Sequence, residues 1–134
     1  MRRRLGTAEV AHLATTGADG RPHVVPLTFA VDGELIYFAV DAKPKRTTNL
    51  RRLKNIAVHP SVCLLVDHYE GDWTRLWWIR ADGRARIVDD VATAERAIEL
   101  LARKYVQYAL TRPQGPVVEI AIERLSGWQA HPDT

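Results

Sequence analysis

The sequence predicts a mainly β fold, a small antiparallel barrel with two or so helices covering its openings. Short apolar runs alternate with turns that contain Gly, Asp or Pro, and only two longer segments have helical spacing. Strand–helix–strand alternation and a Gly-rich phosphate loop are both absent from the sequence, which argues against a doubly wound nucleotide-binding fold. With 134 residues, 46% of them hydrophobic, the chain is expected to form one domain over residues 1–134.

The first part of the chain has the punctuation of antiparallel strands. An apolar run at 10–17 is followed by the turn sequence ADGRP, a second run at 23–31, an Asp–Gly turn and a third run at 34–40. This spacing predicts two hairpins that share the strand 23–31. Pro26 lies in that strand and has no N–H for a ladder, so we expect the strand at a sheet edge, at a bulge or where a ligand faces the backbone.

Two helices are predicted in the remainder of the chain. The first runs from about residue 45 to residue 59 and is ended by Pro60. The second covers residues 90–110, and its apolar stripe should pack on the sheet.

Strands are predicted around and between these helices, at residues 61–69, 73–88 and 116–125. In the segment 73–88, one face is expected to hold Trp77, Ile79, Ala81, Ala85 and Ile87, and the other Trp78, Arg80, Asp82, Arg84 and Arg86. In the segment 116–125, Val118, Ile120 and Ile122 alternate in the same way with Glu119, Ala121 and Glu123. Both patterns are typical of a strand with one buried face. The pair Asp82–Gly83 is either a hairpin turn or part of a strand that runs through it.

Charge and cysteine content limit the classes of protein. A net charge of +3 permits a phosphorylated ligand or nucleic acid, but the excess of positive charge is small. The single Cys63 excludes an internal disulfide framework and is expected to be a small buried hydrophobe. No apolar run approaches the roughly 20 residues needed to cross a bilayer, and the arginines at 2–4 are not followed by an uninterrupted apolar segment. A cytoplasmic protein with no membrane partner is therefore expected.

The segment DAKPKRTTNLRRLKN, residues 41–55, holds six of the nineteen Lys and Arg residues. At its predicted helix start, free backbone N–H groups and the positive end of the helix dipole coincide with basic and hydroxyl side chains. These are Lys43, Lys45, Arg46, Thr47 and Thr48. A phosphate would bind well at such a position, but the pattern alone favours a solvated helix face, because basic runs are common on exposed helices.

Three tryptophans, Trp73, Trp77 and Trp78, lie within six positions. Alternation places Trp77 toward the core. Trp78 shares a face with arginines and would border a ligand or a partner subunit. Interleaved Trp and Arg also suit single-stranded nucleic acid on a small barrel, but the aromatic motifs of RNA-binding domains are absent from the sequence.

Metal and hydrolytic sites have no candidate residues in the sequence. The five histidines show no i, i+4 pair and no neighbouring Cys set, and no serine lies in a nucleophile-elbow motif. If the protein is an enzyme, a cofactor must carry the reaction.

The order of the motifs resembles a known family. The hairpin LATTGADGRPHVVP, the strand end YFAVD and the segment KRTTNLRRLKNIAVHPSVCLLVD are similar to those of the pyridoxamine phosphate oxidase-like flavin and deazaflavin proteins. The resemblance extends over about residues 13–128. It implies an FMN-binding-like antiparallel split β-barrel, a homodimer, and a cofactor in a groove between the subunits.

The resemblance also implies positions for the cofactor. The phosphate would be held at the strand-to-helix junction, and the ring would lie against the second strand largely through backbone groups. The implied phosphate residues are Lys45, Arg46, Thr47 and Thr48, with Asn49 adjacent, and the implied ring residues are Val25, Pro26, Leu27 and Thr28. Trp73, Trp77 and Trp78 match a region near the phosphate end or from the other subunit.

The later segment DWTRLWWIRADGRARIV is similar to the branch that uses coenzyme F420, a deazaflavin. Extra positive charge, at Arg51, Arg52 and Lys54 or on the face of Arg80, Arg84 and Arg86, would attract the polyglutamate tail of that cofactor. FMN is the alternative cofactor.

The resemblance therefore implies an F420-dependent oxidoreductase that passes a hydride to a small electrophile, such as a conjugated enone or a quinone-like acceptor. No side chain need act as a covalent catalyst. Thr28, Tyr69 or solvent would supply the proton of the product. An FMN-dependent oxidase or reductase, or a module that binds cofactor or nucleic acid without catalysis, are the alternatives.

Overall fold

The computed structural model describes residues 1–40 and 47–131, with residues 47–50 described only as helical backbone. Within these ranges, one sheet is built from β1 (Ala11–Thr16), β2 (Pro22–Leu27), β3 (Ala30–Asp32), β4 (Leu35–Ala39), β5 (Ser61–His68), β6 (Trp77–Ile87) and β7 (Val117–Gln129). The helices are α1 (Arg2–Thr7), α2 (Thr47–Val58), α3 (Val91–Lys104), α4 (Val106–Leu110) and the 3₁₀ turn η1 (Trp73–Arg75).

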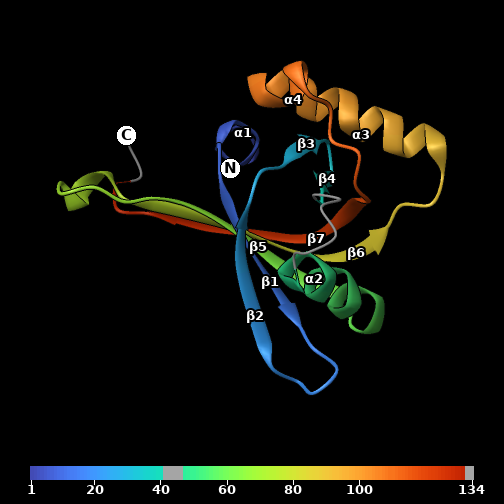
Figure 1. The fold of residues 1–134 in the computed structure, drawn as a ribbon. Coiled ribbons are helices and arrows are strands. Elements are labelled where there is room, and N and C mark those ends of the chain that lie inside the picture. Colours follow the sequence, from blue (N-terminus) through green and yellow to red (C-terminus); the bar gives the residue numbers. More distant parts are fainter. Residues whose placement is uncertain (41–46, 132–134) are drawn as a thin grey trace.

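The sheet is antiparallel throughout and curls into a half-barrel, as the mainly β prediction required. Its strand order is β2-β1-β5-β6-β7-β4-β3, so β2 and β3, which follow one another in the chain, form its two opposite edges. Figure 1 shows α3 and α4 together above β3 and β4, and α2 below them near β1. The ends of β5, β6 and β7 extend away from this body as a long arm, with η1 at its tip.

The core lies on the concave face of the sheet. Leu13, Phe38, Leu64 and Ile120 come from four different strands and are fully buried. They belong to one cluster that also includes Ile56 of α2. The burial of these side chains agrees with the alternation predicted for the strands, because every second residue of a strand points to the same face.

The Asp82–Gly83 pair is part of a strand and not a hairpin turn. β6 continues through it, and the β6–β7 register shifts at this point, which marks a β-bulge. A Cβ on Gly83 would lie 2.5 Å from the carbonyl oxygen of Ala121 and 2.7 Å from a methyl carbon of Ile120. Glycine is needed here because the backbone of β7 approaches too closely for any side chain.

The strand predicted at 23–31 is two strands, β2 and β3. The chain leaves the sheet at Thr28 and Phe29 and rejoins it at the opposite edge. The Tyr105 hydroxyl holds this crossing, since it accepts the Phe29 N–H at 3.1 Å and donates to the Glu9 carbonyl at 2.8 Å. Pro26 does lie on an edge strand, as its missing N–H predicted.

The helix predicted at 90–110 is also divided. Asp90 caps α3 by accepting the Thr93 N–H at 3.0 Å, and Tyr105, with φ −117° and ψ 122°, separates α3 from α4. Ala97 of α3 packs against Tyr37 and Val117 of the sheet. The prediction that this segment packs on the sheet is therefore confirmed. The segment is two helices rather than one, because Tyr105 between them is extended.

The other helices are shorter than α3. α2 begins at Thr47 and ends at Val58, close to the predicted limits. Among the described helices, none is both long and apolar enough to cross a membrane.

Candidate functional site

The strand predicted to carry the cofactor ring has one open face. In the β1–β2 register, Val25 pairs with Leu13 and Pro26 pairs with His12, so Val25 points toward the core and Pro26 away from it. Leu27 is buried, whereas Pro26 is exposed and its neighbour Val24 is 61% exposed. An apolar, edge-strand surface is thus available to a flat ring.

Thr28 follows directly after this strand and contacts a residue that the sequence interpretation did not select. Its hydroxyl lies 2.9 Å from the hydroxyl of Tyr108, which comes from α4. Both side chains are half-buried. The sequence signal that could have identified Tyr108 is its spacing of three residues from Tyr105, which would place both rings on one side of the helix predicted at 90–110.

The predicted phosphate site is only partly within the described residues. Lys45 and Arg46 lie outside them, whereas the backbone of Thr47, Thr48 and Asn49 forms the first turn of α2. The described part of α2 therefore begins within the predicted phosphate site. Free N–H groups and the dipole at a helix N-terminus are the features that favour an anion at such a position.

The last turns of α2 and the β1–β2 hairpin border an open pocket of about 1000 Å³. The pocket combines polar, basic and small residues: Gly17, Ala18, Asp19, Arg21, Pro22, His23, Arg51, Lys54, Asn55, Ala57 and Val58. The Asn55 side-chain amide donates to the Thr15 hydroxyl at 3.0 Å and fixes the helix on β1. Two of the cations proposed as steering charges from the sequence, Arg51 and Lys54, thus face a concave surface.

His23 is the titratable group most affected by this environment. Burial, then the positive charges of Arg51 and Arg52, lower the pKa of its imidazole. Its Nδ1 atom is buried and forms no hydrogen bond with any residue that the structure describes. A neutral imidazole with an unused nitrogen therefore lies beside several cations.

The tryptophans lie on another part of the sheet. Trp73, in η1, is 67% exposed. Trp77 packs against the core cluster, as predicted, with the Arg4 guanidinium 5.0 Å above its ring. Trp78 pairs across β6 and β7 with Trp128. Strands β1 and β5 separate β6 from β2, so a single chain does not bring the tryptophans to the predicted ring strand.

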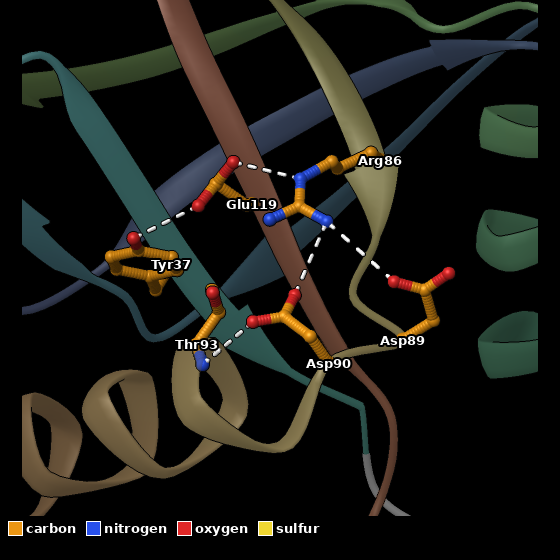
Figure 2. A network of polar contacts seen from close by, with 6 residues as sticks. All are labelled: Tyr37, Arg86, Asp89, Asp90, Thr93 and Glu119. Carbon is orange, nitrogen blue, oxygen red and sulfur yellow. Dashed lines mark hydrogen bonds and ion pairs between the residues drawn. The ribbon is translucent and has the colours of Figure 1, made fainter.

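The arginines of β6 are mostly paired with carboxylates. Figure 2 shows Arg86 between Glu119 and Asp90, with Nε 2.9 Å from Glu119 and Nη1 3.6 Å from Asp90. Tyr37 donates to the other oxygen of Glu119 at 2.9 Å. Burial and this bond raise the pKa of Tyr37 to about 12. The network joins three strands to the start of α3, so Arg86 has a structural role.

Arg80 is similarly placed 3.4 Å from Asp82. The positive face that the sequence suggested for β6 is therefore largely neutralised, apart from the exposed Arg84. Cys63, on the neighbouring strand, is half-buried rather than fully buried. Burial and a hydrogen bond with Asp82 raise the pKa of its thiol to about 11, so it is protonated and unreactive at neutral pH. Across residues 1–40 and 47–131, no group of His, Cys, Asp and Glu is arranged to hold a metal ion.

The fold and the sequence together define the class of protein. The profile of the pyridoxamine 5'-phosphate oxidase family matches residues 1–129. The chain therefore belongs to the pyridoxamine 5'-phosphate oxidase family, with its split-barrel fold. A search of curated protein sequences finds no significant match.

Solved structures share this fold at low sequence identity. A conserved hypothetical protein of Mycobacterium tuberculosis is 20% identical, with a TM-score of 0.78 over 96% of this chain and 81% of that one. An FAD-binding protein of Mesorhizobium loti is 22% identical, with a TM-score of 0.70 over 94% and 89%. A heme-binding protein of Mycobacterium smegmatis is 15% identical, with a TM-score of 0.75 over 99% and 53%. At these identities the similarity concerns the fold.

Proposed function

We propose that the protein is an F420-dependent oxidoreductase that transfers a hydride to a small electrophilic molecule. The observation that carries this proposal is the apolar open face of edge strand β2, which ends at the Thr28–Tyr108 hydroxyl pair. Membership of the family supports a flavin-type cofactor, and one structural neighbour is described as FAD-binding.

The residues of this chain fit such a cofactor at two points. We expect the phosphate to be bound by Lys45, Arg46, Thr47, Thr48 and Asn49, because the described part of α2 begins at Thr47 and a helix N-terminus favours an anion. Val25, Pro26, Leu27 and Thr28 would support the ring, mainly with their backbone and with the apolar surface of Pro26. When bound, the deazaflavin would supply the hydride.

The Thr28–Tyr108 pair gives the chain a means to hold a proton beside the ring. Either hydroxyl can donate to the other at 2.9 Å. A substrate carbanion or enolate that forms next to Thr28 would take the Thr28 proton, and Tyr108 would replace it. Tyr69, the other donor considered from the sequence, is 71% exposed and lies beyond the end of β5, so Thr28 is the better candidate.

Two features favour the deazaflavin over FMN. The tryptophan-rich segment resembles that of the branch that uses coenzyme F420, and α2 carries positive charges that have no ion pair among the described residues. Arg51 and Lys54 are exposed, and neither has an ion pair within the described part of the chain. Such charges would attract a polyanionic tail, which FMN lacks. FMN in the same position is the second candidate, because the FAD-binding neighbour has this fold.

We also propose a homodimer, with the tryptophans of one subunit near the ring site of the other. Two observations support it. Val24 and Trp128, on the face of the sheet away from the core, are 61% and 49% exposed, and the tryptophans cannot reach β2 of their own chain. A cytoplasmic location is proposed with it, supported by the single cysteine.

A steady-state assay tests the proposed function. Reduced deazaflavin is mixed with the protein and with menadione or a cyclic enone, and the return of the oxidised deazaflavin absorbance is followed. We expect turnover that depends on both the protein and the acceptor. Turnover with reduced FMN and none with the deazaflavin would reject the first candidate in favour of the second.

A further inference from the structure

The second half of β7 has a free edge. β4 pairs with β7 only as far as Ala121, and Ile122 donates its N–H to the Glu34 carbonyl at 2.9 Å. β6, in contrast, pairs with β7 as far as Gln129 along the arm (Figure 1). Over residues 123–129, the side of β7 away from β6 therefore has no strand beside it within the described chain. Such an edge presents backbone N–H and carbonyl groups to another chain.

The register identifies the backbone groups at this edge. Ala130 donates its N–H to the carbonyl of Leu76, directly before β6. Because successive residues of a strand direct their backbone groups to opposite sides, Leu125 and Gly127 direct theirs away from β6. Neither has a backbone hydrogen bond on that side with any residue that the structure describes. Their spacing of two residues is the one at which an added strand forms its hydrogen bonds.

An open groove of about 530 Å³ lies between this edge and α1. Its lining includes Arg3 and Arg4 on the side of α1 and Gly127, Trp128 and Gln129 on the side of β7. The Arg4 Nη1 donates to the Gln129 Oε1 at 3.1 Å, so the face of β7 that holds Gln129 is turned toward α1. Trp128 is on the opposite face, because side chains alternate along a strand. An open groove beside a strand edge suits an extended segment better than a compact ligand.

The groove is positively charged. Arg3 is exposed and has no ion pair in the described ranges. Arg4 contacts the Gln129 amide and the Trp77 ring, which are both uncharged. No carboxylate is among the described residues that line the groove. A second copy of the chain at this edge would bring two more arginines to the groove and be repelled, whereas an acidic segment would be attracted.

We propose that the free edge of β7 binds an extended acidic segment of another protein, which joins the sheet as a further strand. The backbone groups of Leu125 and Gly127 would form its hydrogen bonds. Arg3 and Arg4 would select carboxylates at every second position of the segment, because alternate side chains of a strand share one face. The side chains between them would lie beside Trp128, which is 49% exposed. This interaction depends on neither the cofactor nor the reaction proposed above.

Calorimetry with capped hexapeptides tests the proposal on the unaltered protein. We expect an alternating Glu–Val peptide to bind and a Lys–Val peptide of the same length not to bind. The Glu–Val peptide with N-methylated backbone amides keeps its charges but lacks N–H donors, so its binding should be lost. Equal binding of the methylated and unmethylated peptides would overturn the added strand. Equal binding of the Lys–Val peptide would overturn the selection of carboxylates.

Hydrogen exchange of the Leu125 and Gly127 amides, measured by NMR, locates the bound peptide. Slower exchange of both amides with saturating Glu–Val peptide supports the proposal, and unchanged exchange would overturn it. Exchange that slows in the free protein as its concentration rises would also overturn it, and would assign the edge to a second copy of the chain.

The double variant Arg3→Gln, Arg4→Gln tests the charge of the groove. We expect it to bind the Glu–Val peptide about tenfold more weakly. The matched control Arg96→Gln, Arg103→Gln removes two exposed arginines of α3, outside the groove, and should keep the full affinity. Equal weakening in the two double variants would show that net charge alone attracts the peptide and would overturn the site.

Discussion

The hydroxyl oxygens of Thr28 and Tyr108 lie 2.9 Å apart, although 80 positions separate the two residues in the chain. Thr28 directly follows the strand proposed to face the cofactor ring, and Tyr108 reaches Thr28 from α4, beyond the break at Tyr105. The extended conformation of Tyr105 turns α4 away from the axis of α3. The division of the predicted helix thus places a second hydroxyl at the proposed reaction site.

Removal of the Tyr108 hydroxyl should have two measurable effects. Tyr108→Phe leaves the half-buried Thr28 hydroxyl without this partner, so we expect the free energy of unfolding to fall by about 1 kcal/mol. If Thr28 supplies the proton, kcat falls while KM stays nearly constant. Urea denaturation and steady-state kinetics measure these effects. Tyr69→Phe, at an exposed position, is the control, and an equal loss of kcat in both variants would contradict the proton role.

The bulge at Gly83 should tolerate no side chain. Gly83→Ala places a Cβ 2.5 Å from the Ala121 carbonyl oxygen, a backbone atom that cannot move alone. We expect a loss of about 3 kcal/mol in the free energy of unfolding, measured by urea denaturation. Gly71→Ala meets no atom within 4 Å and is the matched control. Equal stability of the two variants would show that β7 is free to move away.

Lys104 should make stability depend on pH in the alkaline range. Its Nζ is buried 3.9 Å from the centre of the Phe29 ring and has no hydrogen-bond partner in the described part of the chain. Burial lowers the pKa of Lys104 from 10.5 to about 8. Between these pH values the unfolded chain binds more protons at this site, so the contribution of Lys104 to the free energy of unfolding rises with pH.

Cys63 and Tyr37 have the opposite effect, because their raised pKa values make the folded protein retain protons above about pH 9 and pH 10 respectively. The contribution of Lys104 is therefore measured as the difference in the free energy of unfolding between the unaltered protein and Lys104→Met. Denaturation at pH values from 7 to 10 gives this difference. We expect the variant to lose the rise with pH. Parallel curves for the two proteins would mean that the Lys104 amine is not buried in solution.

Charge at the start of α2 should contribute to cofactor affinity. Lys45→Gln combined with Arg46→Gln removes both cations of the proposed phosphate site, and we expect deazaflavin binding to weaken by about 2 kcal/mol. Fluorescence titration measures the change. The control is Arg103→Gln, which removes an exposed cation in the last turn of α3. If the double variant keeps the full affinity, the phosphate lies elsewhere.

The sequence predicted those elements in which buried and exposed side chains alternate regularly. Alternation along β6 identified Ile79, Ala81 and Ala85 as buried, and the same reasoning identified Val118 and Ile120. It was wrong only for the last residue of β6, Ile87, which was expected to share this face but is exposed because the strand ends there.

The features that local sequence patterns did not predict depend on contacts between residues that are far apart in the chain. Asp82–Gly83 has the composition of a turn, but its conformation follows from the approach of Ala121, which no local pattern reveals. The crossing at Thr28 and Phe29 depends on the Tyr105 hydroxyl, 76 positions away from Phe29. For the same reason Tyr108 and the pocket around His23 escaped the sequence interpretation, since both need elements that are distant in the chain.

Titration of the purified protein with coenzyme F420, FMN and heme, followed by fluorescence quenching, tests the central proposal most directly. We expect saturable quenching by F420 at lower concentrations than by FMN, with no specific response to heme. Saturable binding of FMN or heme without any response to F420 would contradict it.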